Sequence, residues 1–204
     1  MAKQQTTIHG IKLFSASHPK MKKVKKEHGE ATLHGTKIWD SSFVLMDYFR
    51  LDPLPKGTVV FDVGCGWGPM TLFLQKKFDS QVFSIDADDS VEPYLRKQCE
   101  ANGYEPLFWP VKISQLRRSD LSMADTIVGG DICFWDSLRD DWWKLFARAK
   151  KAGVSNILLA DPGRSPFLEL SDWAKEKYGA ELWSHTIKKP VKAKRYVLEV
   201  NFDD

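Results

Sequence analysis

Cysteine and long apolar runs are both scarce in this 204-residue sequence. Its three cysteines, Cys65, Cys99 and Cys133, form no close pair and no metal-like grouping with the five histidines. Scattered cysteines in odd number are typical of reduced proteins, so we expect a cytoplasmic protein without a metal site. No apolar run approaches the roughly 20 residues that span a bilayer, and the opening residues lack an apolar signal core. We therefore expect a soluble protein with no membrane partner.

A strong charge of either sign is also missing. The net charge of +3 is too small to indicate a nucleic-acid partner by itself, although the positive charge is unevenly placed. Five lysines lie between Lys20 and Lys26, and five basic residues lie between Lys188 and Arg195. These segments are either solvated or part of a surface that binds a polyanion. We favour the first reading, because the first cluster lacks the interleaved aromatic residues of a single-strand RNA platform.

From Thr58 onward, short apolar runs alternate with longer amphipathic segments. The runs predict strands at Thr58–Val63, Gln81–Ile85, Pro106–Val111, Thr126–Val128 and Asn156–Ala160. The amphipathic segments predict helices at Pro69–Lys77, Val91–Asn102, Ser137–Ala152 and Pro166–Tyr178, with Ser90 and Asp136 as caps. This alternation is typical of an α/β protein with a doubly wound, mostly parallel sheet. Two final strand-like runs without a helix between them, Glu181–Ile187 and Tyr196–Phe202, predict an antiparallel pair at the sheet edge.

The start of the chain differs from this pattern. Residues 1–35 are polar and show no sustained period, so we interpret them as an arm or loose extension. Residues 36–204 then form one domain. Asp40 is placed to cap a helix from Ser41 to Phe49, which Pro53 ends.

A glycine-rich turn follows the first predicted strand. Gly64, Gly66 and Gly68 stand between Val63 and a predicted helix, where a backbone must turn sharply and can approach a ligand. An acidic residue, Asp86, ends the next strand, where a carboxylate can accept hydrogen bonds from ribose hydroxyls. The alternative is that Asp86 only caps the following helix. Together the two features predict a nucleotide pocket.

The pattern Asp62-Val-Gly-Cys-Gly-Trp-Gly68 differs from the G-x-G-x-x-G of dinucleotide sites, where a helix faces a pyrophosphate. It offers instead a carboxylate where a ligand ammonium could sit. The segment resembles the first motif of class I, or seven-stranded Rossmann-like, S-adenosylmethionine-dependent methyltransferases, and the resemblance extends from Thr58 to the C-terminus. It implies S-adenosylmethionine as cofactor, with Asp62 near the methionine tail and Asp86 on the ribose. The cofactor-binding residues that follow from it are Trp39, Asp62, Gly64, Cys65, Gly66, Gly68, Asp86, Ala87, Ile113, Ser114 and Asp131.

The acceptor side is predicted after the fourth strand. Ligands of open α/β sheets bind outside the carboxyl ends of the strands, which places Asp131, Phe134 and Trp135 near a substrate. Asp131 could hold an acceptor amine and stabilise its developing charge, while an aromatic ring can accept a cation. We therefore take Asp131 and Phe134 as the candidate catalytic residues. The alternative for Phe134 and Trp135 is core packing.

Three stretches resemble one branch of this class more narrowly. Asp131-Ile-Cys-Phe134 is similar to the DxxY motif of seven-stranded protein-lysine methyltransferases, with phenylalanine in place of tyrosine. The stretch from Ile38 to Leu45 is similar to their W-x-S-x-x-L segment, and Asp161-Pro-Gly-Arg164 resembles the branch that modifies the electron-transfer flavoprotein β subunit. This resemblance implies N-methylation of a protein lysine. It also implies a substrate rim of Trp135, Asp161 and Arg164.

Two other functions remain open from the sequence. A small-molecule or RNA methyltransferase would use the same cofactor pocket with a different rim, and basic segments on the same face as Asp131 would favour RNA. A non-catalytic S-adenosylmethionine-binding protein would keep Asp62 and Asp86 without needing Asp131. A protein substrate is favoured over nucleic acid.

Overall fold

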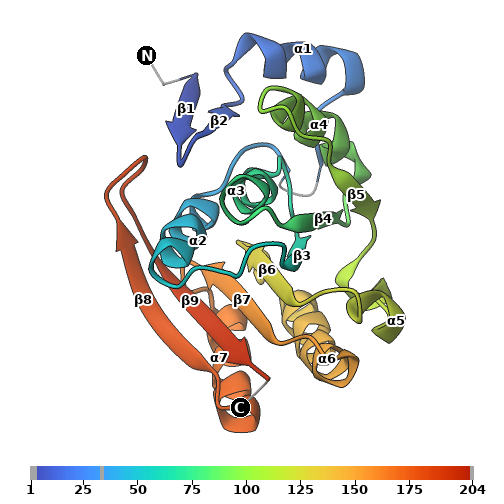
Figure 1. Cartoon of the computed structure of the whole chain (residues 1–204), viewed down its shortest axis with the longest axis vertical. Coiled ribbons are helices and arrows are strands. Elements are labelled where there is room, and N and C mark those ends of the chain that lie inside the picture. Colours follow the sequence, from blue (N-terminus) through green and yellow to red (C-terminus); the bar gives the residue numbers. More distant parts are fainter. Residues whose placement is uncertain (1–3, 33–34, 203–204) are drawn as a thin grey trace.

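Seven strands form one sheet in the computed structural model, which describes residues 4–32 and 35–202 (Figure 1). The spatial order is β5-β4-β3-β6-β7-β9-β8; the first five strands pair in parallel, and β9 is antiparallel to β7 and β8. This confirms the predicted doubly wound α/β fold with its antiparallel C-terminal pair. The strands are β3 (Val59–Val63), β4 (Gln81–Asp86), β5 (Leu107–Pro110), β6 (Thr126–Gly130), β7 (Asn156–Asp161), β8 (Glu181–Ile187) and β9 (Ala193–Asn201).

Helices cover both faces of this sheet because successive residues of a buried strand point to opposite sides. Val60 of β3 packs with Leu45 and Leu72 on one face, and Phe61 belongs to the core of Trp142 on the other. The two faces therefore carry two separate apolar cores. The helices are α2 (Asp40–Leu51), α3 (Pro69–Phe78), α4 (Glu92–Glu100), α5 (Arg118–Leu121), α6 (Asp136–Ala152) and α7 (Ser165–Tyr178), with single 3-10 turns η1 (Asp89–Val91) and η2 (Ile113–Gln115).

The helix caps differ from the sequence prediction. Asp40 is the first residue of α2 rather than its cap, since Trp39 occupies the cap position and the Asp40 carboxylate accepts a hydrogen bond from Arg195. Asp136 likewise lies inside α6. At η1 the cap is Asp88, whose carboxylate accepts from the Ser90 backbone. Asp88 thus caps η1 in place of Ser90, and Trp39 and Trp135 occupy the cap positions of α2 and α6.

The prediction of a loose arm is wrong for residues 4–32. They form a hairpin of β1 (Gln5–Ile8) and β2 (Ile11–Phe14) followed by α1 (Pro19–His28), and α1 packs against α4. Buried apolar residues anchor both parts, because Ile11 and Leu13 alternate on the strand and Met21 and Val24 share one face of the helix. Five lysines conceal this short apolar period in the sequence. The division of the chain at residue 35 stays a prediction, and residues 33–34 beside it lie outside the described part.

The three cysteines are free and buried. Burial raises the pKa of Cys99 and that of Cys133 to about 12, so neither thiol is a ready nucleophile. Among the described residues, no three His, Cys, Asp or Glu side chains lie close enough to hold a metal ion. The same residues contain no helix with both the length and the apolarity to cross a bilayer.

Candidate functional site

A cavity of about 390 Å³ opens at the carboxyl ends of β3, β4 and β6. Its position is the one predicted for the ligand, outside the strand ends of an open α/β sheet. Of the residues named from the sequence, those that line it are Trp39, Gly64, Gly66, Asp86, Ala87, Ile113, Asp131, Phe134 and Trp135. Cys65, Gly68, Ser114, Asp62, Asp161 and Arg164 do not line it.

The glycine turn forms the floor of this cavity. Gly64 and Gly66 both adopt positive φ angles, +70° and +51°, which favour glycine. A Cβ atom on Gly64 would lie 2.2 Å from the side chain of Ile132, so a larger residue has no room there. A Cβ atom on Gly66 would meet nothing within 4 Å. The Gly66 backbone is therefore bare toward open space, as close approach of a ligand requires.

Asp86 lies beside the turn at the end of β4. Its Oδ2 accepts a hydrogen bond from the Gly66 backbone at 2.9 Å, and its Oδ1 accepts one from the Asp88 backbone at 3.0 Å. Burial raises the pKa of Asp86. Because the helix-capping bonds are made by Asp88 instead, the capping alternative for Asp86 loses its basis. The carboxylate both fixes the loop and reaches the cavity.

Asp62 is not among the residues that line the cavity. Its Oδ2 accepts hydrogen bonds from the backbone nitrogen and the hydroxyl of Thr71, at 3.0 and 2.7 Å. The side chain is buried, and this burial raises the pKa of Asp62 to about 6. Asp62 therefore ties the end of β3 to α3. Its contact with a ligand ammonium stays a prediction.

A segment from residue 35 to residue 39, here called the strap, forms one wall of the cavity. Gly35, Lys37 and Trp39 line the cavity, and the Lys37 ammonium lies 4.3 Å from the Trp39 ring centroid. Trp67 holds the strap, because its Nε1 donates a hydrogen bond to the Gly35 carbonyl at 2.7 Å. The Trp67 ring in turn stacks on Tyr94 at 4.8 Å. No role for Trp67 was predicted from the sequence, although a bulky aromatic residue inside a glycine turn is an unusual feature that could have indicated one.

At the other end of the cavity, Asp131 is held by three groups. Its backbone nitrogen donates a hydrogen bond to the Ala160 carbonyl, and its Oδ2 accepts one from the Ser41 backbone nitrogen at 3.2 Å. Its Oδ1 lies 3.1 Å from Arg164 Nη1, and this Nη1 also lies 2.6 Å from the Asp161 carboxylate. The Asp131 backbone has a positive φ of +59°. The structure thus joins the predicted rim residues Asp161 and Arg164 to Asp131 behind the cavity wall.

Phe134 and Trp135 belong to the cavity wall. Their rings meet edge to face with centroids 4.5 Å apart, and Trp135 is 50% exposed. The Arg164 guanidinium lies 6.0 Å from the Phe134 ring centroid. Such exposure does not fit plain core packing for Trp135. The cavity therefore has Asp86 on its β4 side and Asp131 on its β6 side, and Phe134 and Trp135 also line it.

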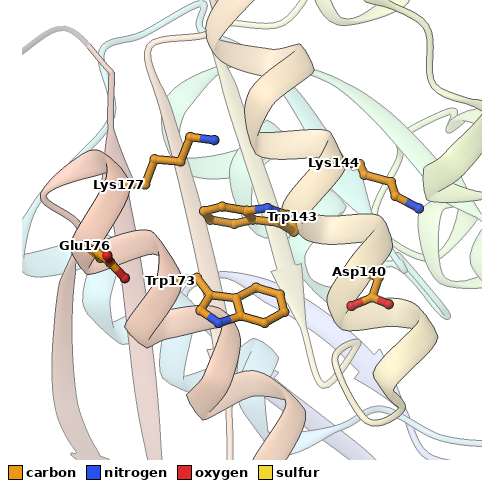
Figure 2. Close-up of a pocket in the computed structure, with 6 residues that line it drawn as sticks. All are labelled: Asp140, Trp143, Lys144, Trp173, Glu176 and Lys177. Carbon is orange, nitrogen blue, oxygen red and sulfur yellow. The ribbon is translucent and has the colours of Figure 1, made fainter.

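A second, more open hollow of about 580 Å³ lies between α6 and α7 (Figure 2). Trp143 and Trp173 form its base, with ring centroids 5.5 Å apart. Charged side chains of both signs surround them, from Asp140, Lys144, Glu176 and Lys177. None of these residues lines the cavity at the glycine turn. This hollow contains no predicted site residue.

The fold is that of the class I S-adenosylmethionine-dependent methyltransferases. Precorrin-6y C5,15-methyltransferase from Geobacter metallireducens superposes with a TM-score of 0.57 at 13% identity, over 86% of this chain and 94% of that chain. Magnesium protoporphyrin IX methyltransferase from Synechocystis PCC 6803, solved with bound S-adenosylhomocysteine, also gives 0.57 at 13% identity, over 79% and 82%. These likenesses show the fold.

In sequence, the chain is similar to electron transfer flavoprotein β subunit lysine methyltransferases. The protein of Rattus norvegicus is 25% identical over 130 residues, or 63% of this chain and 50% of the relative, and that of Xenopus laevis is 27% identical over 133 residues. A ribosomal protein L11 methyltransferase of Caldanaerobacter subterraneus is 32% identical over 84 residues. The chain spans about half the length of the first two relatives. No protein-family model matches it.

Proposed function

We propose that this protein is an S-adenosylmethionine-dependent methyltransferase. The observation that carries the proposal is the pairing of Gly66 with Asp86: a bare glycine backbone and a carboxylate face one cavity at the sheet's carboxyl edge. These groups fit the cofactor, since Asp86 can accept hydrogen bonds from ribose hydroxyls. Ile113 and Val111 supply an apolar flank for the adenine, while Trp39 covers the cavity from the strap.

We infer that the acceptor is a protein lysine. The first support for this substrate class is that the three stretches that resemble lysine methyltransferases meet at Asp131, through its hydrogen bonds with Ser41 and Arg164. The related lysine methyltransferases of the electron transfer flavoprotein β subunit point to the same class. The two basic segments lie apart, one on α1, which packs against α4, and the other on the β8–β9 edge of the sheet. This separation weakens the case for an extended polyanion such as RNA.

The residues of the chain have separable tasks in this reaction. When bound, the cofactor supplies a sulfonium methyl group that an amine lone pair can attack in line. Asp131 is the group that can orient this amine and stabilise the positive charge that it gains. Arg164 and the Ser41 backbone hold the Asp131 carboxylate in place. Phe134 and Trp135 line the same cavity. We expect them to limit the access of water to Asp131, which would strengthen its electrostatic interaction with the amine.

The experiment that tests the function uses methyl-labelled S-adenosylmethionine, a cell extract and the purified protein. Label that protease removes and nuclease does not remove is the expected result, and amino-acid analysis should then find methyl-lysine. Label in RNA or in small molecules would replace the substrate class and keep the enzyme. Cofactor binding by calorimetry without any labelled product would favour a non-catalytic binding protein. Absence of cofactor binding would overturn the whole proposal.

A further inference from the structure

The end of the β8–β9 hairpin carries four lysines without a counter-ion among the described residues. Residues 188–194, here called the basic tip, contain Lys188, Lys189, Lys192 and Lys194, and all four side chains are exposed. Within the described residues, none of them forms an ion pair. The next residue, Arg195, differs because it pairs with Asp40 at 3.2 Å. The basic tip is thus an uncompensated patch of positive charge.

This patch lies next to the acceptor end of the cavity. Strand β9 pairs with β7 only from Asn201 to Tyr196, opposite Asp161, whereas its pairing with β8 continues to Ala193. The basic tip therefore extends past the carboxyl end of β7, the edge at which the cavity opens. Figure 1 shows this hairpin on the opposite side of the molecule from α4 and β5.

A chain of hydrogen bonds connects the hairpin to Asp131. Arg195 Nε donates to the Ser41 hydroxyl at 3.1 Å, and the Ser41 backbone nitrogen donates to Asp131 Oδ2 at 3.2 Å. On the same side, Gly163 packs on the ring of Tyr196, since a Cβ atom there would lie 2.8 Å from that ring. These contacts fix the base of the basic tip to the rim formed by Asp161 and Arg164.

From this placement we propose that the basic tip binds an acidic segment of the protein substrate, close in sequence to the methylated lysine. The inference rests on the proposed function, because it takes the cavity to hold that lysine. Exposed charges act over about one Debye length, roughly 10 Å at 0.1 M salt, so the partner carboxylates must lie near the cavity mouth. Charges at the edge of an interface act mainly on partner choice and association rate.

The composition of the basic tip favours an acidic peptide over nucleic acid. Its sequence, Lys-Lys-Pro-Val-Lys-Ala-Lys, has no aromatic residue on which a base could stack. The exposed aromatic residue of this hairpin, Trp183, lies near the start of β8 instead. The other basic segment, on α1, packs against α4 at the far end of the sheet, so the two segments do not form one continuous track.

The test compares two labelled peptides, one with a single lysine between runs of glutamate and one with glutamine at the same positions. Their affinities are measured by fluorescence anisotropy at low salt in the presence of S-adenosylhomocysteine. We expect the acidic peptide to bind at least about tenfold more tightly. The triple variant Lys188→Gln/Lys189→Gln/Lys192→Gln should abolish this preference. The matched variant Lys22→Gln/Lys23→Gln/Lys26→Gln, which removes the same charge from α1, should keep it.

Three results would overturn the inference: equal affinity of the parent protein for both peptides, an unchanged preference in the hairpin variant, or tighter binding of oligouridylate that depends on the same lysines. Cofactor calorimetry on every protein separates this outcome from the proposed function. Normal S-adenosylhomocysteine binding without a peptide preference refutes the basic tip alone. The peptide comparison on the parent protein needs no substitution, so a misfolded variant does not leave the inference open.

Discussion

Asp131 and Arg164 form an ion pair at the acceptor end of the cavity, with 3.1 Å between Asp131 Oδ1 and Arg164 Nη1. The Asp131 side chain is almost fully buried, whereas that of Arg164 keeps 30% of its surface exposed. A buried carboxylate that is held at fixed orientation suits electrostatic stabilisation of a cation, because little reorganisation is needed during reaction.

Asp131→Ala should therefore lower turnover by about a hundredfold while cofactor affinity barely changes. Asp131→Asn is the matched control, because it keeps the size and one hydrogen-bond acceptor but removes the charge. A large loss in the asparagine variant assigns the effect to charge. Steady-state methylation and calorimetry measure the two quantities, and unchanged turnover of Asp131→Ala would remove this residue from the mechanism.

Asp86→Ala should weaken binding of S-adenosylmethionine by roughly 1–3 kcal/mol, the usual loss for hydrogen bonds to a charged group. The variant also leaves the Gly66 backbone nitrogen without its partner, so Asp86→Asn serves as a control that can keep an acceptor for it. NAD should not bind to the parent protein. Calorimetry decides both points, and equal binding of NAD would contradict the assignment of the pocket.

Asp62→Asn should change how stability depends on pH. The folded protein holds the Asp62 proton up to about pH 6, while an unfolded chain releases it near 3.8. The contribution of this group is thus fully present below about pH 4 and is lost as the pH rises through about 6. Relative to the parent, the variant should gain up to roughly 3 kcal/mol between those limits. Urea unfolding at a series of pH values measures the free energy of unfolding of both proteins. A difference between variant and parent that does not change with pH would refute the raised pKa of Asp62.

Gln98→Met should loosen the N-terminal hairpin. The Gln98 amide accepts a hydrogen bond from the Phe14 backbone nitrogen at 2.9 Å and donates one to its carbonyl at 2.8 Å. Methionine fits the space but leaves both buried groups unpaired, at a cost of roughly 1–3 kcal/mol. Hydrogen exchange should accelerate in residues 4–28 more than in β3. Exchange that stays unchanged there would show that apolar packing alone fixes the hairpin.

The alternating pattern after Thr58 was sufficient to predict the sheet and its helices, because buried parallel strands and amphipathic helices leave strong periodic signals. The hairpin and α1 were missed because their apolar residues are few and stand among lysines. Besides its buried apolar residues, the hairpin is held by Gln98, which lies 84 positions away from Phe14 in sequence. A contact of this range leaves no local pattern.

The candidate site likewise has residues that could be predicted from local motifs and residues that could not. The sequence motifs named Asp86, Gly66 and Asp131, all of which line the cavity. The orientation of Asp62 toward Thr71 depends on how the turn packs on α3, and the motif does not contain that information. The strap and its bond to Trp67 were missed for a related reason, since they join segments that only the fold brings together. The assigned roles of the site residues stay predictions until the variants above are measured.

The cavity wall has an optical consequence. Two of the eight tryptophans line the cavity: Trp39 at the end of the strap, and Trp135 just before α6. Indole emission depends on the polarity and quenching groups around the ring, so a ligand that displaces water there alters the fluorescence of the unlabelled protein. Trp67 and Trp142 are buried and supply a steady background. Neither Trp143 nor Trp173 lines this cavity. Replacing both by phenylalanine would simplify the emission spectrum, so that the binding of each ligand can be followed by the change in tryptophan fluorescence.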